Sequence, residues 1–412
     1  MKVAYVTMLF PAASETFTSN DVRELAAHGL EMSVHSLRPA VGDTERLAGE
    51  RGVEGVARSY NTGMGSVLAG LRVALRRPHV AIGLLAVLLR RCIKQPLTLV
   101  KSLALYPRVL EVFDDLRRRP PDVVHACWSD FPSMVLYLVQ RHLPSCVTSI
   151  SFVAHDILVG YGLSGTVGRR ADLVRTVARV NVRQVEERFG VPAASIEVIV
   201  DGLDLGLLPP PAERTPRSVV TAGRLVEQKG TDQVLRVFAR IHRRWPDVTL
   251  RVLGSGPLLP QLQGLAAELG VTNAVTFAGH VAQRGVLEEM RRAEVFLFLS
   301  ETSYDRLPNV VKEAMLCGCA CIASDTEGIE ELIEHGKNGF VVARGDLDAA
   351  ERHLVDVFGG RVKVGALTRA AEVAMRDAFD LQASVRRYQA RWAELVALRR
   401  HGRSDALPGT GG

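Results

Sequence analysis

One loop in the second half of the chain combines glycines with two cations. Arg224 and Lys229 bracket the segment from Gly223 to Gly230, which follows a short apolar run and opens a helical pattern near Thr231. Glycine lets the backbone approach a ligand closely, and Arg and Lys neutralise phosphate. The loop would therefore suit a phosphate-bearing ligand. Its spacing fits a solvated basic turn equally well, so both interpretations stay open at this point.

A second loop contains two glycines directly after an apolar run that ends at Leu253. Gly254 and Gly256 stand in the sequence Gly-Ser-Gly-Pro. So short a pattern would suit close contact between backbone and ligand, and it would suit a simple tight turn as well.

A third loop places a carboxylate ahead of a helix. Asp305 precedes Pro308, which suits a first helical turn. The start of this helix, Pro308-Asn309-Val310, would turn free N–H groups and the positive end of the helix dipole toward an anion. Glu313 lies on the same helix. If it is buried, sugar or ribose hydroxyls could serve as its partners; otherwise it is an exposed helical glutamate.

Short β-rich runs alternate with helical patterns around these loops, which predicts parallel sheets flanked by helices. In the first half we expect strands at 2–7, 32–37, 122–126, 147–152, 173–177 and 196–200. In the second half we expect strands at 218–222, 248–253, 275–278, 295–299, 320–323 and 340–342. The predicted fold is α/β, with two Rossmann-like doubly wound domains facing a cleft that is lined by the carboxyl ends of their strands.

The domain boundaries follow from the same pattern. We expect an N-terminal Rossmann-like domain at 1–208, a proline-rich linker at 209–217 and a C-terminal Rossmann-like domain at 218–378. Residues 379–400 should form a helix that packs back on the N-terminal domain. The polar, glycine-rich residues 401–412 should form a disordered tail.

The composition is that of a globular protein, with 47% hydrophobic and 23% charged residues and a net charge of +6. We expect no nucleic-acid partner. Six cysteines are too few for a disulfide scaffold and suit a reducing compartment. The N-terminus lacks the features of a signal peptide, and no apolar run approaches the ~20 residues of a spanning helix. A cytoplasmic location is therefore expected.

The segment 66–110 is unusual in its charge pattern. It contains no Asp or Glu, and its basic residues stand among Leu, Val, Ile and Ala: Arg72, Arg76, Arg77, Arg90, Arg91, Lys94, Lys101 and Arg108. Cationic helices with apolar faces lie in the headgroup layer of anionic membranes. We predict peripheral contact with a membrane through 66–110. The alternative is a pair of helices packed on the first domain with a solvated basic face.

Taken together, the loops resemble the donor site of the family 4 glycosyltransferases, over nearly the whole chain and most strongly from 219 to 342. Gly223-Arg-Leu-x-x-x-Lys229-Gly230 resembles the family's pyrophosphate loop, and Asp305 to Glu313 its paired-acid motif. Other matching segments are Gly279-His280-Val281, Ala323 to Ile329, Ser14-Glu15-Thr16-Phe17, Ala154-His155-Asp156-Ile157 and Val200 to Asp204. This chain has Asp305 where the family usually has Glu, and its His155 region is shorter than usual.

The resemblance implies a GT-B fold and a retaining transfer of a hexosyl-type sugar from a nucleoside diphosphate sugar, with no metal or other cofactor. The acceptor would be a saccharide or a polyprenyl-linked lipid in surface or exopolysaccharide biosynthesis. Arg224 and Lys229 would stabilise the departing diphosphate, Asp305 and His155 would hold the donor sugar, and Glu313 the ribose. The remaining donor-binding residues would be Gly223, Gly254, Gly256, His280, Val281, Pro308, Asn309 and Val310, with Ser14, Glu15 and Thr16 on the acceptor side.

Two other functions remain open on the sequence alone. A nucleotide-sugar epimerase of the same fold also releases a nucleoside diphosphate, but the helix with Glu313 favours transfer. A non-catalytic sugar-nucleotide-binding partner is favoured only by Asp305. Trp128 and Phe131 follow a strand end in the first half, where they would line an acceptor site or pack in the core.

Overall fold

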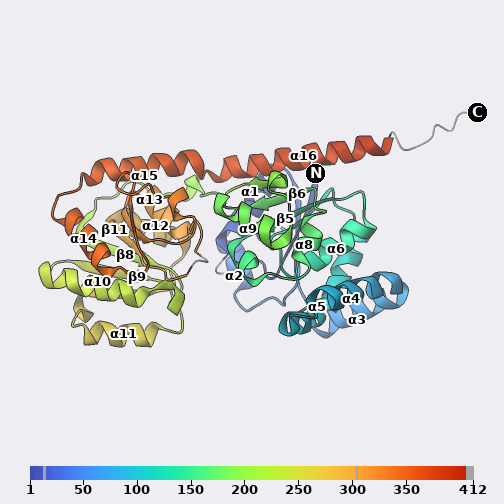
Figure 1. The fold of residues 1–412 in the computed structure, drawn as a ribbon, viewed down its shortest axis with the longest axis horizontal. Coiled ribbons are helices and arrows are strands. Elements are labelled where there is room, and N and C mark those ends of the chain that lie inside the picture. Colours follow the sequence, from blue (N-terminus) through green and yellow to red (C-terminus); the bar gives the residue numbers. More distant parts are fainter. Residues whose placement is uncertain (13–14, 303–304, 405–412) are drawn as a thin grey trace, which may run out of the picture. The chain divides into compact units, whose positions relative to one another are not determined.

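The computed structural model describes residues 1–404 except 13–14 and 303–304. It divides into two compact units. The first unit comprises Met1–Asp201 together with the C-terminal helix from Leu381, and the second comprises Gly202–Asp380. Figure 1 shows the elements of each unit. Both units are α/β, and each holds one parallel sheet. The predicted fold class of two Rossmann-like units is confirmed.

The first unit contains a seven-stranded sheet in the order β3-β2-β1-β4-β5-β6-β7, and all its neighbouring strands are parallel. The strands are β1 (Lys2–Thr7), β2 (Glu31–Ser36), β3 (Ala57–Ser59), β4 (Val123–Ala126), β5 (Val147–Phe152), β6 (Leu173–Thr176) and β7 (Ile196–Val198). Six of them were predicted, and β1 and β5 have the predicted bounds. The sequence did not predict β3, because a strand of three residues at the sheet edge leaves no alternating pattern.

Ten helices in the described part of the first unit surround this sheet. They are α1 (Thr16–Ala27), α2 (Thr44–Glu50), α3 (Met64–Arg76), α4 (Pro78–Cys92), α5 (Pro96–Arg118), α6 (Ser133–His142), α7 (Ala154–Val159), α8 (Ser164–Gly168), α9 (Arg179–Phe189) and α16 (Leu381–Ser404). α3 and α5 pack tightly, since a Cβ atom at Gly70 would lie 2.5 Å from the Cα of Pro107.

Helix α16 packs on the first unit through aromatic side chains. Tyr388 and Trp392 are fully buried, and the Trp392 ring lies edge-on to Tyr5, with 6.2 Å between ring centroids. The helix extends to Ser404, so residues 401–404 are helical rather than part of a tail as expected. Arg399 donates hydrogen bonds to the carbonyl oxygen of Cys146 and to Asp172, which fixes the helix close to its end. The rest of the expected tail, 405–412, lies outside the described residues.

The second unit contains a six-stranded parallel sheet in the order β10-β9-β8-β11-β12-β13. Its strands are β8 (Thr215–Ala222), β9 (Thr249–Leu253), β10 (Val275–Gly279), β11 (Ala293–Phe298), β12 (Ala320–Ser324) and β13 (Phe340–Val342). Its helices are α10 (Thr231–Arg244), α11 (Leu259–Glu268), α12 (Gln283–Arg292), α13 (Asn309–Leu316), α14 (Leu347–Phe358) and α15 (Val364–Ala378). All six strands were predicted, with bounds that differ by a few residues at most.

The start of β8 corrects one expectation. The strand begins at Thr215 and includes Pro216, within the stretch 209–217 that was expected to be a linker. Proline lacks the N–H that a central strand donates, but it is tolerated near the first residue of a strand. The unit boundary itself lies earlier, between Asp201 and Gly202.

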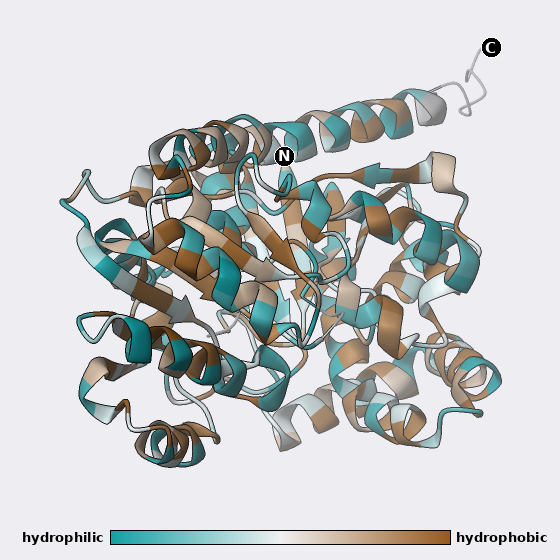
Figure 2. Ribbon diagram, turned by 60° about the vertical axis from the view of Figure 1, so that its left-hand side comes forward, coloured by the Kyte–Doolittle hydropathy of each residue, from teal (hydrophilic) through white to brown (hydrophobic). Residues whose placement is uncertain are grey.

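The strands carry the core of each unit. Every residue of β5 and of β12 is buried, and Figure 2 shows strands that are mostly hydrophobic beside helices of mixed character. β12 reads as a nearly continuous apolar run, as strands buried on both faces do, whereas β5 carries buried Thr148, Ser149 and Ser151 among its apolar residues. Cys317, Cys319 and Cys321 are fully buried in this core.

The strand order of each sheet reverses direction at one point, between β1 and β4 in the first unit and between β8 and β11 in the second. In open α/β sheets, ligands bind beyond the carboxyl ends of the strands at such a switch point. The loops that follow these four strands are therefore where a functional site is expected.

Candidate functional site

The switch point of the second sheet is bridged by an ion pair. Lys229, in the loop after β8, contacts the carboxylate of Asp305, in the loop after β11. Ser300 lies within hydrogen-bond distance of the same carboxylate, and the Thr326 hydroxyl donates to the Asp305 carbonyl oxygen at 3.0 Å. Both the side chain and the backbone of Asp305 are thus held in place. The sequence predicted both residues of the pair as donor-site residues, but not that they touch.

Glycines bring the loops of this edge into contact. A Cβ atom at Gly254 would lie 1.8 Å from the carbonyl oxygen of Gly223, and one at Gly256 would lie 2.3 Å from that of Leu225. Gly230 has a positive φ of 59°, and a Cβ there would lie 1.9 Å from the carbonyl oxygen of Leu299. Any side chain at these positions would force the loops apart. The glycine pattern is therefore explained by contact between neighbouring loops.

The loop after β8 presents Arg224 and Lys229 differently. Arg224 is exposed and has no ion-pair partner in the part of the chain that the structure describes. The Lys229 side chain is 22% exposed, and its ammonium lies 5.9 Å from the centre of the Phe298 ring. A small pocket beside it is lined by Gly223, Lys229 and Phe298, among others. One cation is therefore available to a ligand, while the other is already paired with a carboxylate.

Helix α13 begins where the sequence placed it. Pro308 precedes its first residue Asn309, and Asn309 and Val310 are partly exposed. Leu307 has a positive φ of 47°, a costly conformation for a non-glycine residue that is typical of functional sites. The loop therefore enters the helix in a constrained conformation, with the first N–H groups of α13 at its start.

Glu313 is buried on α13, at 8% exposure, rather than lying on an exposed helical face. Burial raises the pKa of its carboxyl to about 7, and a hydrogen bond from Gln283 and the charge of Lys312 only partly oppose this effect. The amide of Gln283 donates to Glu313 Oε1 at 3.0 Å. A buried carboxylate with one donor has room for further hydroxyl donors, such as those of a ribose.

The turn after β10 contributes the residues next to Gln283. His280 is exposed and Val281 partly exposed, and Gln283 begins α12. Sequence reasoning missed Gln283. No motif marks it, and its contact with Glu313 spans 30 positions of the chain. The only signal in the sequence was that Gln283 is a polar residue just after the Gly279-His280-Val281 turn.

The other predicted residues belong to the first unit. His155 is exposed on α7, its ring centroid lies 6.4 Å from that of Trp128, and partial burial lowers its pKa. Glu15 precedes α1, whose first residue is Thr16, and accepts a hydrogen bond from Trp128 Nε1 at 3.3 Å. This contact bridges the switch point between β1 and β4. Ser14 lies outside the described residues.

Two acidic residues beside Trp128 were also missed. Burial raises the pKa of Asp130 to about 7, and burial together with the charge of Asp130 raises the pKa of Asp156 well above its usual range. Each has one buried carboxylate oxygen without a hydrogen-bond partner among the described residues. The sequence offered one signal for Asp130, its position in Trp128-Ser-Asp after a strand end.

Comparison with known proteins shows what this arrangement is similar to. Residues 210–367 match the model of the family described as "Glycosyl transferases group 1". A GDP-mannose-dependent alpha-(1-6)-phosphatidylinositol monomannoside mannosyltransferase of Mycolicibacterium smegmatis is 30% identical over 253 residues, 58% of this chain and 65% of that protein. A Mycobacterium tuberculosis protein of the same name is matched over 56% of its length. The chain thus spans less than two thirds of these relatives. The putative colanic acid biosynthesis glycosyltransferase WcaL of Escherichia coli is 24% identical, over 86% of this chain and 90% of that one.

Solved structures share the fold of the whole chain. Anabaena Alr3699/HepE in complex with UDP matches with a TM-score of 0.70 at 18% identity, over 96% of this chain and 100% of that one. A sucrose-phosphate synthase from Thermosynechococcus elongatus matches with a TM-score of 0.69 at 15% identity, over 97% and 100%. The segment 210–367, which carries the Lys229–Asp305 pair, is thus similar to the group 1 glycosyl transferases, and the chain has the GT-B fold of these solved structures.

Proposed function

We propose that the protein is a retaining glycosyltransferase that moves a hexosyl-type sugar from a nucleoside diphosphate sugar to a saccharide or lipid-linked acceptor. The observation that carries the proposal is the edge of the second sheet. Lys229 pairs there with Asp305, Arg224 is exposed in the same loop as Lys229, and α13, which follows Asp305, carries the buried Glu313. Cations and oriented N–H groups suit a diphosphate, and a buried carboxylate suits ribose hydroxyls. The UDP complex of the Anabaena structure supports this choice of ligand.

Transfer of the sugar requires stabilisation of its leaving group, the nucleoside diphosphate. As the bond between the anomeric carbon and the donor phosphate oxygen breaks, negative charge grows on the diphosphate, and fixed positive groups stabilise it. The acceptor oxygen bonds to the same face of the anomeric carbon, and its proton passes to the departing phosphate. Asp305 would hold a hydroxyl of the donor sugar, and His155 the sugar near its reacting carbon. We propose that no metal and no further cofactor take part.

A panel of radiolabelled UDP-, GDP- and ADP-sugars tests the proposal. Transfer to a saccharide or lipid acceptor, or slow hydrolysis in its absence, is expected with at least one donor. An epimerase would instead return an isomerised sugar nucleotide, and a binding protein would leave every donor intact. Either of these two results would overturn the assignment. Thermal shift identifies the donor first, since a ligand at ~100 times its Kd adds roughly 2.7 kcal/mol to the unfolding free energy.

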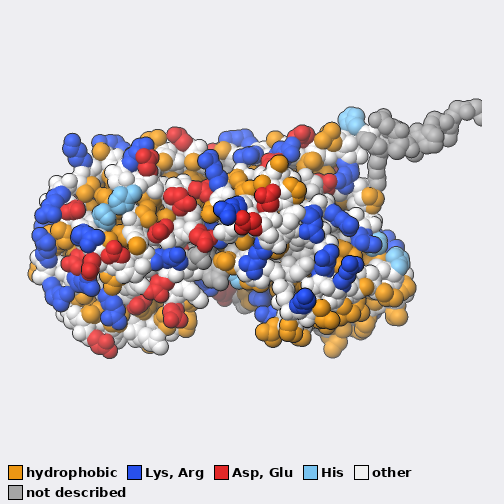
Figure 3. All heavy atoms as spheres, in the orientation of Figure 1, with side chains coloured by type: hydrophobic (Ala, Val, Ile, Leu, Met, Phe, Trp, Pro, Cys, Tyr) orange, Lys and Arg blue, Asp and Glu red, His pale blue; other side chains and the backbone are white. Residues whose placement is uncertain are grey.

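We further propose that the protein acts at the cytoplasmic face of a membrane, through α3, α4 and α5. Twelve of the sixteen exposed large hydrophobic residues in the described chain lie between Met64 and Leu103, and Figure 3 shows them gathered over these helices. The basic, acid-free segment 66–110 covers α4, nearly all of α3 and the first fifteen residues of α5, whose later residues include Glu111, Asp114 and Asp115. Within the described residues, no helix is both long and apolar enough to cross a bilayer. A surface that is apolar and basic suits the headgroup layer of an anionic membrane.

Co-sedimentation with liposomes tests the membrane proposal. Binding to anionic liposomes should be strong at low salt and weak at high salt. Exchange of Arg76, Arg77, Arg90 and Arg91 for Glu should abolish it. No binding at low salt, or unchanged binding after the exchange, would show that these helices face water or a protein instead.

A further inference from the structure

A hollow of about 360 Å³ lies between α3 and α5, lined by the C-terminal halves of both helices. Its volume falls in the range of small-ligand sites. Five arginines line it: Arg72, Arg76, Arg77, Arg117 and Arg118. Three carboxylates line it as well: Glu111, Asp114 and Asp115. Which of these charges are already paired decides what the hollow can bind.

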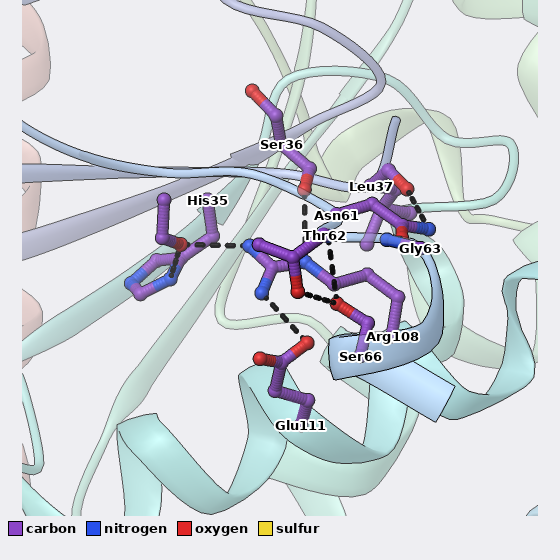
Figure 4. Close-up of polar contacts among 10 residues, drawn as sticks. His35, Ser36, Leu37, Asn61, Thr62, Gly63, Ser66, Arg108 and Glu111 are labelled. Carbon is purple, nitrogen blue, oxygen red and sulfur yellow. Dashed lines mark hydrogen bonds and ion pairs between the residues drawn. The ribbon is translucent and has the colours of Figure 1, made fainter. Parts of the chain in front are cut away.

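Glu111 is neutralised by a buried arginine that does not line the hollow. Arg108 is 2% exposed, and its guanidinium lies 3.0 Å from Glu111 Oε2. The same guanidinium donates to the Ser36 carbonyl oxygen at 3.0 Å and to Ser59 Oγ at 2.8 Å. Figure 4 shows Arg108 between Ser36 and Glu111. Arg108 thus ties α5 to the edge of the sheet, and the charge of Glu111 is compensated from the protein side.

Asp114 is neutralised by its own helix. Arg117 lies 3.0 Å from one carboxylate oxygen of Asp114, and Arg118 lies 2.5 Å from the other. Asp115 is the third carboxylate, and partial burial and the charge of Glu111 raise its pKa. Arginines of α5 thus compensate two of the three carboxylates of the lining, Glu111 and Asp114.

The other three arginines of the hollow, two on α3 and one directly after it, are not paired with any carboxylate that the structure describes. Arg72, Arg76 and Arg77 have no ion-pair or hydrogen-bond partner for their guanidinium groups anywhere in residues 1–12, 15–302 and 305–404. Cations near helix C-termini are common, because the helix dipole favours them. Three unpaired guanidinium groups that share one hollow with three carboxylates, two of which are already paired, are not explained by the dipole alone. They leave the hollow with an excess of positive charge.

The hollow also borders the apolar surface. Leu68, Leu71 and Leu75 are exposed and, at 3.6 residues per turn, share one side of α3. Arg72 and Arg76 lie next to this stripe, on the flank that lines the hollow. An anion in the hollow would thus sit at the border of the apolar stripe, as the phosphate of a lipid lies at the border of its acyl chains.

We propose that the hollow between α3 and α5 binds the phosphate group of an anionic phospholipid headgroup. Arg72 and Arg76, with Arg77 beside them, are its ligands, because a guanidinium donates two parallel hydrogen bonds to phosphate oxygens. This inference rests on the proposed membrane contact and adds a discrete site to it. A discrete site would fix the orientation of the first unit on the membrane, whereas unspecific charge attraction would only bring the unit to the surface.

The test uses monomeric dihexanoyl phosphatidylglycerol and the full-length protein in isothermal titration calorimetry. One binding site is expected. Arg72→Ala with Arg76→Ala should weaken it about thirty-fold, since each basic residue near an anionic lipid contributes about a factor of five. The matched control is Arg236→Ala with Arg243→Ala, which removes the same charge from exposed positions of α10, outside the hollow and outside the helices of the proposed membrane contact. It should leave the monomer affinity within about twofold. Asp115→Asn should strengthen binding, because it removes a carboxylate from the lining. Unchanged thermal unfolding midpoints check the fold of each variant.

The outcomes separate this inference from the membrane proposal. Absence of saturable binding, or equal losses in the two double variants, would overturn the site even if liposomes still bind. Inorganic phosphate that binds as tightly as the lipid would show a site for free phosphate and would overturn the headgroup assignment. Failure of the wild-type protein to bind liposomes would refute the membrane proposal by itself.

Discussion

Replacement of Glu313 by Gln should make the free protein more stable at alkaline pH. Glu313 is buried, with a pKa of about 7 where an ordinary glutamate titrates near 4.5. The folded state therefore keeps a proton that the unfolded chain loses between these two values. Because the folded pKa is the higher one, the stability of the wild-type protein falls as the pH rises through this window and levels off above it.

The size of the effect follows from the interval between the two pKa values. An interval from 4.5 to about 7 corresponds, at about 1.36 kcal/mol per unit, to about 3 kcal/mol of unfolding free energy. Glutamine has no charge to bury, and its amide oxygen can still accept the hydrogen bond from Gln283. Glu313→Gln should thus match the wild type near pH 4.5 and exceed its stability by about 2–3 kcal/mol at pH 8.

The same substitution should lower the affinity for the donor nucleotide, although it raises the stability of the free protein. Ribose hydroxyls would donate to the ionised carboxylate, and a hydrogen bond to a charged group is worth about 1.5–3 kcal/mol, or roughly tenfold to a hundredfold in affinity. Binding of UDP or GDP to the wild type should tighten as the pH rises toward 7 and should release protons. Calorimetry in buffers with different ionisation enthalpies measures this release.

Urea denaturation across the pH range, with exposed Glu268→Gln as the control, provides the stability measurement. If the wild type and Glu313→Gln show the same dependence of stability on pH, Glu313 is not a buried titrating group and the reasoning fails. If stability responds as expected but nucleotide affinity does not, the carboxyl is buried for packing and the assigned ribose contact is wrong.

Four further outcomes are expected at the same edge. Arg224→Ala and Lys229→Ala should each lower turnover about 10²–10³-fold with the fold intact, and near-wild-type rates in both would remove the donor-site assignment. EDTA should leave the rate unchanged, whereas a strict metal requirement would contradict the proposed mechanism. Asp305→Asn should impair transfer strongly, whereas Asp305→Glu should be tolerated or alter sugar preference. A fully active Asn variant would show that Asp305 does not contact the donor sugar. Gly254→Ala should lower the unfolding midpoint and nucleotide affinity together, because its Cβ would lie 1.8 Å from a carbonyl oxygen.

The strands and the α13 helix could be predicted because their signals are local. Apolar runs bounded by glycine, proline and polar residues gave twelve strands close to their observed bounds, and Pro308 gave the start of α13. The short strand at Ala57–Ser59 lies on the sheet edge and has too few residues for a pattern. The start of β8 was missed because proline was taken to exclude a strand, although Pro216 stands near its first residue.

The site itself could be predicted only as a set of loops. Lys229 and Asp305 are 76 positions apart, and their contact depends on β8 and β11 being neighbours in the sheet. The burial of Glu313 depends on how α12 packs beside α13, and spacing along one helix carries no information about its neighbours. Gly254 is required by the approach of another loop, which a local turn pattern does not reveal. Non-local contacts decide all three.

The six strands of the second sheet follow the same order as β3-β2-β1-β4-β5-β6 of the first, yet the switch points of the two sheets carry different chemistry. In the second unit a cation, Lys229, meets Asp305, and Arg224 stands exposed nearby, so the edge suits a charged phosphate. In the first unit Glu15 is held by the neutral indole N–H of Trp128. Burial raises the pKa values of both Glu15 and Asp130 beside it. Carboxyl groups that resist ionisation can both donate and accept hydrogen bonds, which suits the hydroxyl groups of an uncharged ligand. Under the proposed function, this difference in charge would match a donor nucleotide on the second sheet and a sugar acceptor on the first.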